Sequence, residues 1–231
     1  MANNTIQVPI RKTLEGKEFP ESGSERIDLA LKELEDSRNP AYEAVYMPEL
    51  IDARIYSPED SRIWQVWWIT PSIRATGKTK QGNPVVVYAH IPNYFSKSEN
   101  ITKAINQGLV NYAGRIPQNE FQRLLDLEDK KRVFVIPHSD LKNSEGGVIS
   151  LKKALKHPQT IPFLGGEERA AKYFERHKEV YGENIGIWHT DDLAEEPLAR
   201  ALFVGVGVGG LGGVLDYSGC FPRSAPKSEA S

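Results

Sequence analysis

Short apolar runs alternate with amphipathic segments through the second half of the chain, and this alternation constrains the fold most. β-Branched residues predict strands at 84–91, 132–136 and 184–188. Helical spacing of apolar residues predicts helices at 100–110, 117–131, 148–155 and 167–181. A strand, helix, strand, helix, strand order is typical of a parallel sheet with right-handed crossovers. We therefore expect an α/β protein.

An antiparallel hairpin is predicted ahead of these units. Two strand-like runs, 62–75 and 84–91, flank a polar loop that contains Gly77 and Gly82. Pro71 lies inside the first run, which indicates a bulge or an edge position because proline cannot donate to a sheet ladder. The expected fold class is therefore α/β with a mixed sheet: an antiparallel hairpin followed by βαβαβ-like parallel strands, with an N-terminal helical segment.

The ends of the chain carry no strand or helix pattern. Residues 1–23 are expected to be a loosely ordered arm and 222–231 a disordered tail. The residues between them, 24–221, are expected to form one α/β domain whose part from 24 to 60 is helical. Within that part the sequence predicts an amphipathic helix after a capping box at 22–25, and a short helix at 48–55.

Charge and cysteine content exclude several classes of protein. The chain has 29 Lys and Arg against 31 Asp and Glu, a net charge of −2, which argues against a dedicated nucleic-acid binder. Residues 71–157 are locally basic, with 14 Lys and Arg against 7 Asp and Glu, and suit an anionic partner. Cys220 is the only cysteine, so a disulfide scaffold is excluded. With no apolar leader or membrane-length run, we expect a cytoplasmic protein without membrane contact.

Two glycine motifs lack the context that their usual function needs. Gly205 to Gly210 fits G-x-G-x-x-G, but the helix and second strand of a dinucleotide site do not follow. The stretch 76–79 imitates the end of a phosphate-binding loop, yet its first glycine is replaced by Ser72. The alternation of Val and Gly at 204–209 instead predicts a strand with one bare face, which a ring, a ligand or another backbone can approach closely. The alternative is a weakened strand that runs into a loop at 210–213.

Three histidines directly follow predicted strands. They are His90, His138 and His189, whereas His157 and His177 lie in polar helical surroundings and are expected on the surface. If the three strands are parallel neighbours, their carboxyl ends meet along one edge of the sheet, where open α/β proteins place their sites. Neighbouring strands are about 4.8 Å apart, so these imidazoles would converge.

Acidic residues follow two of these histidines and suggest a chemistry. Imidazole and carboxylate ligands suit zinc or manganese, whose bound water is a nucleophile near neutral pH. We expect metal ligands at His90, His138, His189 and Asp192. Catalytic roles are expected for His138, Asp140, His189 and Asp191. The hypothesis is therefore a metal-assisted or His/Asp-assisted hydrolase of a small or phosphorylated substrate. The alternative is that these residues have only a structural role, because Ser, Thr and Asp after a strand commonly cap the next helix.

A second hypothesis is a non-catalytic protein-binding or assembly protein. It would use the predicted hairpin, which carries Trp64, Trp67 and Trp68, together with the basic middle region and the Gly-rich C-terminal segment. Three tryptophans in a strand region are otherwise typical of a core. The Pro- and Gly-rich stretch 158–168 is interpreted as a rigid connector that buries its apolar residues, with a substrate lid as the alternative. The oligomeric state is not indicated by any of these patterns.

Overall fold

The computed structural model describes residues 26–36, 45–190 and 192–215, and the arm and tail expected at the two ends lie outside these ranges. The helices are α1 Ile27–Asp36, α2 Met47–Tyr56, α3 Arg62–Gln65, α4 Ser98–Asn106, α5 Gln118–Asp126, α6 His138–Lys142, α7 Leu151–Leu155, α8 Thr160–Leu164 and α9 Glu167–Tyr181, with 3₁₀ turns η2 Tyr94–Ser96 and η3 Gly207–Gly209. The strands are β1 Trp68–Lys78, β2 Pro84–Ala89, β3 Gly114–Arg115, β4 Val133–Pro137, β5 Gly147–Ser150, β6 Asn184–Ile187, β7 Leu198–Val204 and β8 Leu211–Val214.

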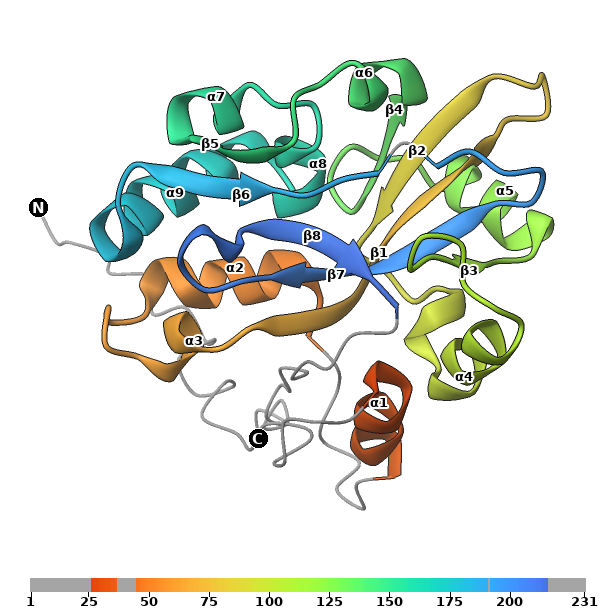
Figure 1. Ribbon diagram of the computed structural model, residues 1–231, viewed down its shortest axis with the longest axis horizontal. Coiled ribbons are helices and arrows are strands. Elements are labelled where there is room, and N and C mark those ends of the chain that lie inside the picture. Colours follow the sequence, from red (N-terminus) through yellow and green to blue (C-terminus); the bar gives the residue numbers. More distant parts are fainter. Residues whose placement is uncertain (1–25, 37–44, 191, 216–231) are drawn as a thin grey trace, which may run out of the picture.

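One curled sheet organises the described residues (Figure 1). Its strand order is β4-β2-β1-β7-β8-β6-β5, and β3 pairs with the start of β7. Neighbouring strands run antiparallel except β6 and β8, which are parallel and share a single register pair, Ile187 with Leu211. The expected βαβαβ unit is therefore wrong. β2 and β4 pair directly and run in opposite directions, so the segment between them is not a parallel crossover.

The predicted hairpin is confirmed. β1 and β2 pair antiparallel from Ile73 opposite Ala89 to Lys78 opposite Pro84. On its other side β1 pairs with β7, and the register shifts between Ile69 and Ile73. Pro71 lies inside this irregularity, as expected of a residue that has no N–H to donate to the ladder.

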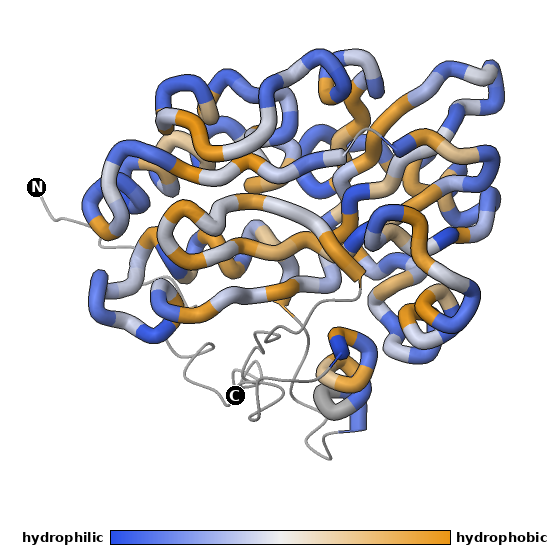
Figure 2. Tube along the Cα trace, in the orientation of Figure 1, coloured by the Kyte–Doolittle hydropathy of each residue, from blue (hydrophilic) through white to orange (hydrophobic). Residues whose placement is uncertain are grey.

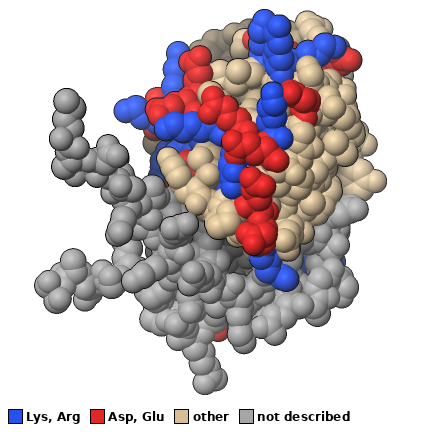
Figure 3. Space-filling model, turned by 90° about the vertical axis from the view of Figure 1, so that its left-hand side faces the viewer, with Lys and Arg blue, Asp and Glu red and all other residues tan. Residues whose placement is uncertain are grey.

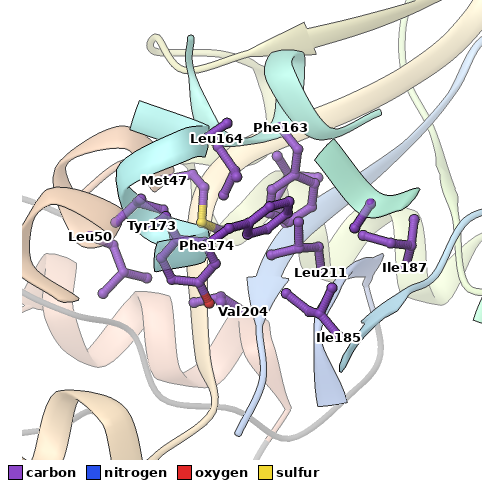
Figure 4. Close-up of a cluster of buried hydrophobic side chains, with 14 of the residues drawn as sticks. Met47, Leu50, Phe163, Leu164, Tyr173, Phe174, Ile185, Ile187, Val204 and Leu211 are labelled. Carbon is purple, nitrogen blue, oxygen red and sulfur yellow. The ribbon is translucent and has the colours of Figure 1, made fainter. Parts of the chain in front are cut away.

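Two apolar clusters lie on the two faces of the sheet. Because side chains alternate along a strand, Val86 and Tyr88 join the cluster under α2, α8 and α9, and Val87 and Ala89 join the cluster with α4 and α5. Hydrophobic residues concentrate along the central strands (Figure 2). Figure 4 shows the first cluster, in which Phe163 and Leu164 pack against side chains of the strands. The connector interpretation of 158–168 is thus supported, because both side chains are buried.

Two local predictions need correction. The segment 148–155 is not one helix, since Val148 and Ile149 belong to β5 and only 151–155 are helical. The alternating stretch 204–209 is not a strand either: β7 ends at Val204, and the glycines that follow form η3 and its flanking turns. Among the described residues no helix is long and apolar enough to span a bilayer.

Candidate binding site

The three strand-end histidines do not share one edge of the sheet. The backbone N–H of His90 bonds to the carbonyl of Arg132 at the beginning of β4, 2.8 Å away, while His138 follows the end of β4 beside the beginning of β2. The antiparallel direction of these strands therefore separates His90 from His138 by the length of a strand. β6, which precedes His189, lies across β1, β7 and β8 from them.

His90 is a structural histidine. Its ring is fully buried, with Nε2 2.8 Å from the carbonyl oxygen of Pro162 and Nδ1 3.0 Å from Oγ of Ser72. A carbonyl only accepts, so Nε2 carries the proton and the Ser72 hydroxyl donates to Nδ1. Burial lowers the pKa of His90 to about 4. Both ring nitrogens are occupied, which leaves no position for a metal.

The other predicted site residues lie apart. Asp140 is exposed on α6, where Ser139 donates to it at 3.3 Å. Asp192 receives a 2.6 Å hydrogen bond from Asn111 and forms an ion pair with Arg200. Asp191 lies outside the described residues. No group of three His, Cys, Asp or Glu suited to a metal exists among the residues that the structure describes, so the metal-binding prediction is not supported.

His157 and His177 are buried rather than on the surface, so that prediction is wrong. The ring of His157 lies 5.2 Å from the ring of His189, and its Nδ1 accepts from the backbone N–H of Gln159 at 3.2 Å. Burial, with a smaller effect of the His189 charge, lowers the pKa of His157 to about 4. His157 is therefore uncharged near neutral pH.

Two tryptophans and a valine form an exposed apolar surface on the sheet, which we call the indole platform. Trp67, Trp188 and Val208 are 41%, 44% and 51% exposed. The indole N–H of Trp188 donates to the carbonyl of Gly209 at 2.8 Å. The ring of Trp67 stacks on Phe203 at 5.2 Å between centroids. A contiguous exposed apolar patch marks a contact surface more often than single scattered apolar residues do.

Glycines allow these rings to lie against backbone. A Cβ at Gly209 would lie 2.5 Å from Cζ2 of Trp67, and one at Gly186 would lie 2.5 Å from Nε1 of Trp188. At Gly212 it would lie 2.5 Å from Phe203. The expectation that bare glycine backbone admits a ring is thus met, although on turns and neighbouring strands rather than on one alternating strand.

Replacing Gly209 with alanine is expected to displace the Trp67 ring and to lower the free energy of unfolding by about 1–3 kcal/mol, as overpacking does. The added methyl group meets a rigid indole rather than a flexible chain. Near-ultraviolet circular dichroism and urea denaturation measure the two effects. Gly82→Ala is the matched control, because no atom lies within 4 Å of the Cβ position at Gly82. Gly82 has a positive φ of 84°, so this variant loses stability through backbone strain alone, and the near-ultraviolet signal of Trp67 should stay unchanged. An unaltered indole spectrum in the Gly209 variant would contradict the assignment.

A buried arginine fixes the backbone on both sides of the platform. Arg54 is fully buried on α2 and donates from Nη1 to the carbonyl of Gly205 at 2.9 Å. It donates from Nη2 to the carbonyl of Val66 at 3.0 Å. Val66 precedes Trp67, and Gly205 begins the loop that carries Val208, so one guanidinium positions two of the three platform segments.

A second polar network holds the segment around Trp188. Arg74, which is 2% exposed, donates to Oγ1 of Thr190 at 3.2 Å and to Oε1 of Gln159 at 3.3 Å. The backbone N–H of Trp188 donates to the carbonyl of Leu211 at 2.8 Å. These contacts rigidify the segment around Trp188.

The neighbouring side of the molecule carries mixed charge. Figure 3 shows basic and acidic side chains interleaved there beside a broad uncharged area. On α9, Lys172 pairs with Glu168 and Arg176 with Glu179. No extended area of one sign is visible on this face, as a nucleic-acid surface would need.

Trp188 was missed as a functional residue, although a signal for it exists. Ile185 and Ile187 are buried, so the period of two along a strand puts Trp188 on the opposite, outward face. Of the three tryptophans expected near the hairpin, Trp64 and Trp68 are buried and Trp67 is exposed. Arg54 carried no sequence signal.

Comparisons with known proteins identify the fold. No protein-family model matches the chain, and no curated protein matches it. A solved structure described as "Accommodation of massive sequence variation in Nanoarchaeota by the C-type lectin fold" is 51% identical, with a TM-score of 0.81 over 91% of this chain and 97% of that one. This similarity overturns the expected parallel α/β class and the expected hydrolase, since it points to a non-catalytic binding protein. The chain belongs to the C-type lectin fold family.

Proposed function

We propose that this protein is a non-catalytic binding protein whose indole platform contacts a protein partner. The observation that carries the proposal is the pair of half-exposed tryptophans, Trp67 and Trp188, that both contact Gly209. Tryptophan is enriched among the few residues that carry most of the binding energy in protein interfaces. A ring already fixed against backbone loses little conformational entropy on binding.

The chemistry of the platform favours a protein over a carbohydrate. A sugar presents many hydroxyl groups that need hydrogen-bonding partners once they are removed from water. The platform offers few of these, because the Trp188 N–H is already used by Gly209 and the side chain of Val208 has no polar atom. Val148, 52% exposed on β5 opposite Gly186, extends the apolar area further.

The similar nanoarchaeotal structure supports the same function. Its description says that the fold accommodates massive sequence variation. Such tolerance requires that the exposed contact residues contribute little to the stability of the scaffold. In this chain the platform backbone is held from behind by Arg54 and Arg74, so Trp67, Trp188 and Val208 are free to serve recognition.

Replacing Trp188 with alanine is expected to weaken binding of platform-directed protein ligands about 30-fold, the effect of a hot spot worth about 2 kcal/mol. The probes are small folded domains selected from a displayed library on the wild-type protein, with affinities measured by biolayer interferometry. Leu127→Ala is the matched control, because Leu127, the C-cap residue of α5, is 44% exposed; this variant should change affinity less than about twofold.

A glycan array tests the alternative that the platform binds carbohydrate; it is probed with the wild type, the Trp188→Ala variant and the Leu127→Ala variant. We expect that many selected domains lose affinity when Trp188 is replaced. We expect no glycan whose binding depends on Trp188. If glycans bind the wild type but not the Trp188 variant, while selected domains are indifferent to it, the platform is a carbohydrate site and the proposal is wrong.

A further inference from the structure

β5 forms one edge of the sheet and carries backbone groups that point away from it. Among the strands that the structure describes, β5 pairs only with β6 and ends the strand order (Figure 1). The N–H of Leu151 donates to the carbonyl of Glu183 at 2.9 Å, which fixes the hydrogen-bonded positions of this ladder. Hydrogen-bonded and non-hydrogen-bonded pairs alternate in an antiparallel ladder, so the pair of Val148 with Gly186, three positions along, is non-hydrogen-bonded. The N–H and C=O of Val148 therefore point outward.

The fold leaves this outward position open. Val148 is 52% exposed, and no described residue forms a hydrogen bond with its N–H or C=O. α7, which follows β5, packs on the opposite face, because Leu151 and Ala154 belong to the buried cluster that contains Ile185. Free edges are commonly protected by proline or by charged residues within the strand, and β5 contains neither. The edge is therefore available to an added strand.

The side chain of Val148 joins this edge to the indole platform. Residues paired across a ladder share one face of the sheet, with Cβ atoms about 4.5–5.5 Å apart, so Val148 lies beside the Cβ position of Gly186. The indole Nε1 of Trp188 lies 2.5 Å from that same Cβ position. The residues between these, Ile185 and Ile187, are buried on the other face. A strand added to β5 would thus place a side chain next to Val148, at the rim of the platform.

The chain on both sides of β5 is basic. Between the beginning of α6 and residue 156, four exposed lysines stand against two acids: Lys142, Lys152, Lys153 and Lys156 against Asp140 and Glu145. Lys153 pairs with Glu145 at 3.4 Å, whereas the other three lysines form no ion pair within the described part of the chain. This excess lies in the stretch 71–157, whose composition suits an anionic partner. Opposite charge across an interface speeds association and disfavours wrong partners.

We infer that the partner of the platform binds through an extended acidic segment that adds a strand to β5. The inference rests on the proposed function and names the form of its partner. Hydrogen bonds to Val148 position the segment, as in other complexes formed by strand addition, and side chains on one face of the segment contact the platform. Acidic side chains that flank the paired residue lie near the lysines of α6 and α7. Because Val148 offers both of its backbone groups, a segment of about three residues is long enough to form the ladder.

Backbone N-methylation of a peptide ligand tests these hydrogen bonds directly. The probes are linear peptides selected from a displayed library on the wild-type protein. Those that lose affinity for Trp188→Ala are synthesised with one N-methyl group at each position in turn. In an added strand one peptide N–H donates to the carbonyl of Val148, while the N–H groups of its two neighbours point away. Methylation at that position is expected to weaken binding about tenfold, and methylation at either neighbour less than about twofold. The selected sequences should be rich in Asp and Glu.

Val148→Pro removes the second hydrogen bond from the protein side. No described residue accepts from the N–H of Val148, and proline is tolerated at edge positions whose N–H faces solvent, so the melting temperature should change by less than about 3 °C. Binding of the same peptides should weaken about tenfold. Val148→Thr is the matched control, because it retains the N–H and the shape of the side chain and should bind within about twofold of the wild type. If the proline variant does not fold, the N-methyl scan, made on the wild-type protein, decides.

Each contrary result has its own meaning. Trp188-dependent peptides that tolerate N-methylation at every position, or that bind the folded Val148→Pro variant as tightly as the wild type, would overturn the inference while leaving the proposed function intact. Trp188-dependent peptides without an excess of acidic residues would overturn it as well. If folded domains depend on Trp188 but no peptide does, the inference fails and the proposed function stands. If neither a domain nor a peptide depends on Trp188, both fail.

Discussion

Replacing Arg54 with methionine is expected to lower the free energy of unfolding by about 4 kcal/mol. The guanidinium donates to the backbone carbonyls of Ile63, Val66 and Gly205 and lies 5.2 Å from the ring centroid of Trp64. Methionine fills a similar volume but leaves the carbonyls of Val66 and Gly205 without this donor, at roughly 1–3 kcal/mol each before the relief of the buried charge is counted, whereas the carbonyl of Ile63 still accepts from the indole N–H of Trp68. Urea denaturation monitored by circular dichroism measures the loss.

Two further variants isolate the contributions. Arg54→Lys retains the charge but cannot reach three carbonyls in different directions, so it should lose part of this stability. Tyr173→Phe removes only the hydroxyl that Arg54 contacts at 3.3 Å and should cost about 1 kcal/mol or less. A methionine variant within about 1 kcal/mol of the wild type would contradict the anchoring role, whatever its effect on binding.

The elements that the sequence predicted well depend on local chemistry. α9 extends from Glu167 to Tyr181 as expected, because its apolar spacing and the flanking glycines act within a few residues. The hairpin and the irregularity at Pro71 follow from turn residues and from the missing proline N–H. These features are fixed by neighbours along the chain, so one sequence is enough to predict them.

Strand direction is decided by distant partners, and there the prediction was wrong. Helical segments between strands are typical of parallel crossovers, but in this fold β2 and β4 lie adjacent and antiparallel. β5 was assigned to a helix because Val148 and Ile149 gain a strand conformation only by pairing with β6. No spacing rule within 148–155 reveals that partner.

The candidate site was only partly predictable for the same reason. The Val and Gly pattern predicted that rings approach glycine backbone closely. The position of Trp67 beside the hairpin predicted it as one candidate contact residue among three tryptophans. His157 was expected on the surface because its sequence neighbours are polar, yet Gln159 and His189 enclose it.

The stability of the fold is expected to fall as the pH decreases from about 6.5 to 4, in part because of His90. Its pKa is lowered by burial to about 4 in the folded protein, whereas the unfolded chain titrates near 6.5. Between these pH values the unfolded state binds a proton that the folded state does not. The free energy of unfolding therefore falls by about 1.4 kcal/mol for each pH unit of acidification, or by about 3 kcal/mol in all. Above pH 6.5 the histidine is neutral in both states and contributes no pH dependence.

His90→Gln tests this assignment with little change in shape. The glutamine amide can donate to the carbonyl of Pro162 and accept from Ser72, as the imidazole does, but it does not titrate. The free energy of unfolding of the variant, measured from pH 7 to 4, should therefore fall less steeply than that of the wild type. The difference in slope should correspond to the uptake of up to one proton on unfolding. His157 and His177, with pKa values also lowered to about 4 by burial, remain in both proteins and supply the residual slope. Equal slopes in the two proteins would contradict the assignment, because they would mean that His90 is also protonated in the folded protein. The hydrogen bonds of His90 to the Pro162 carbonyl and to the Ser72 hydroxyl favour the neutral ring instead.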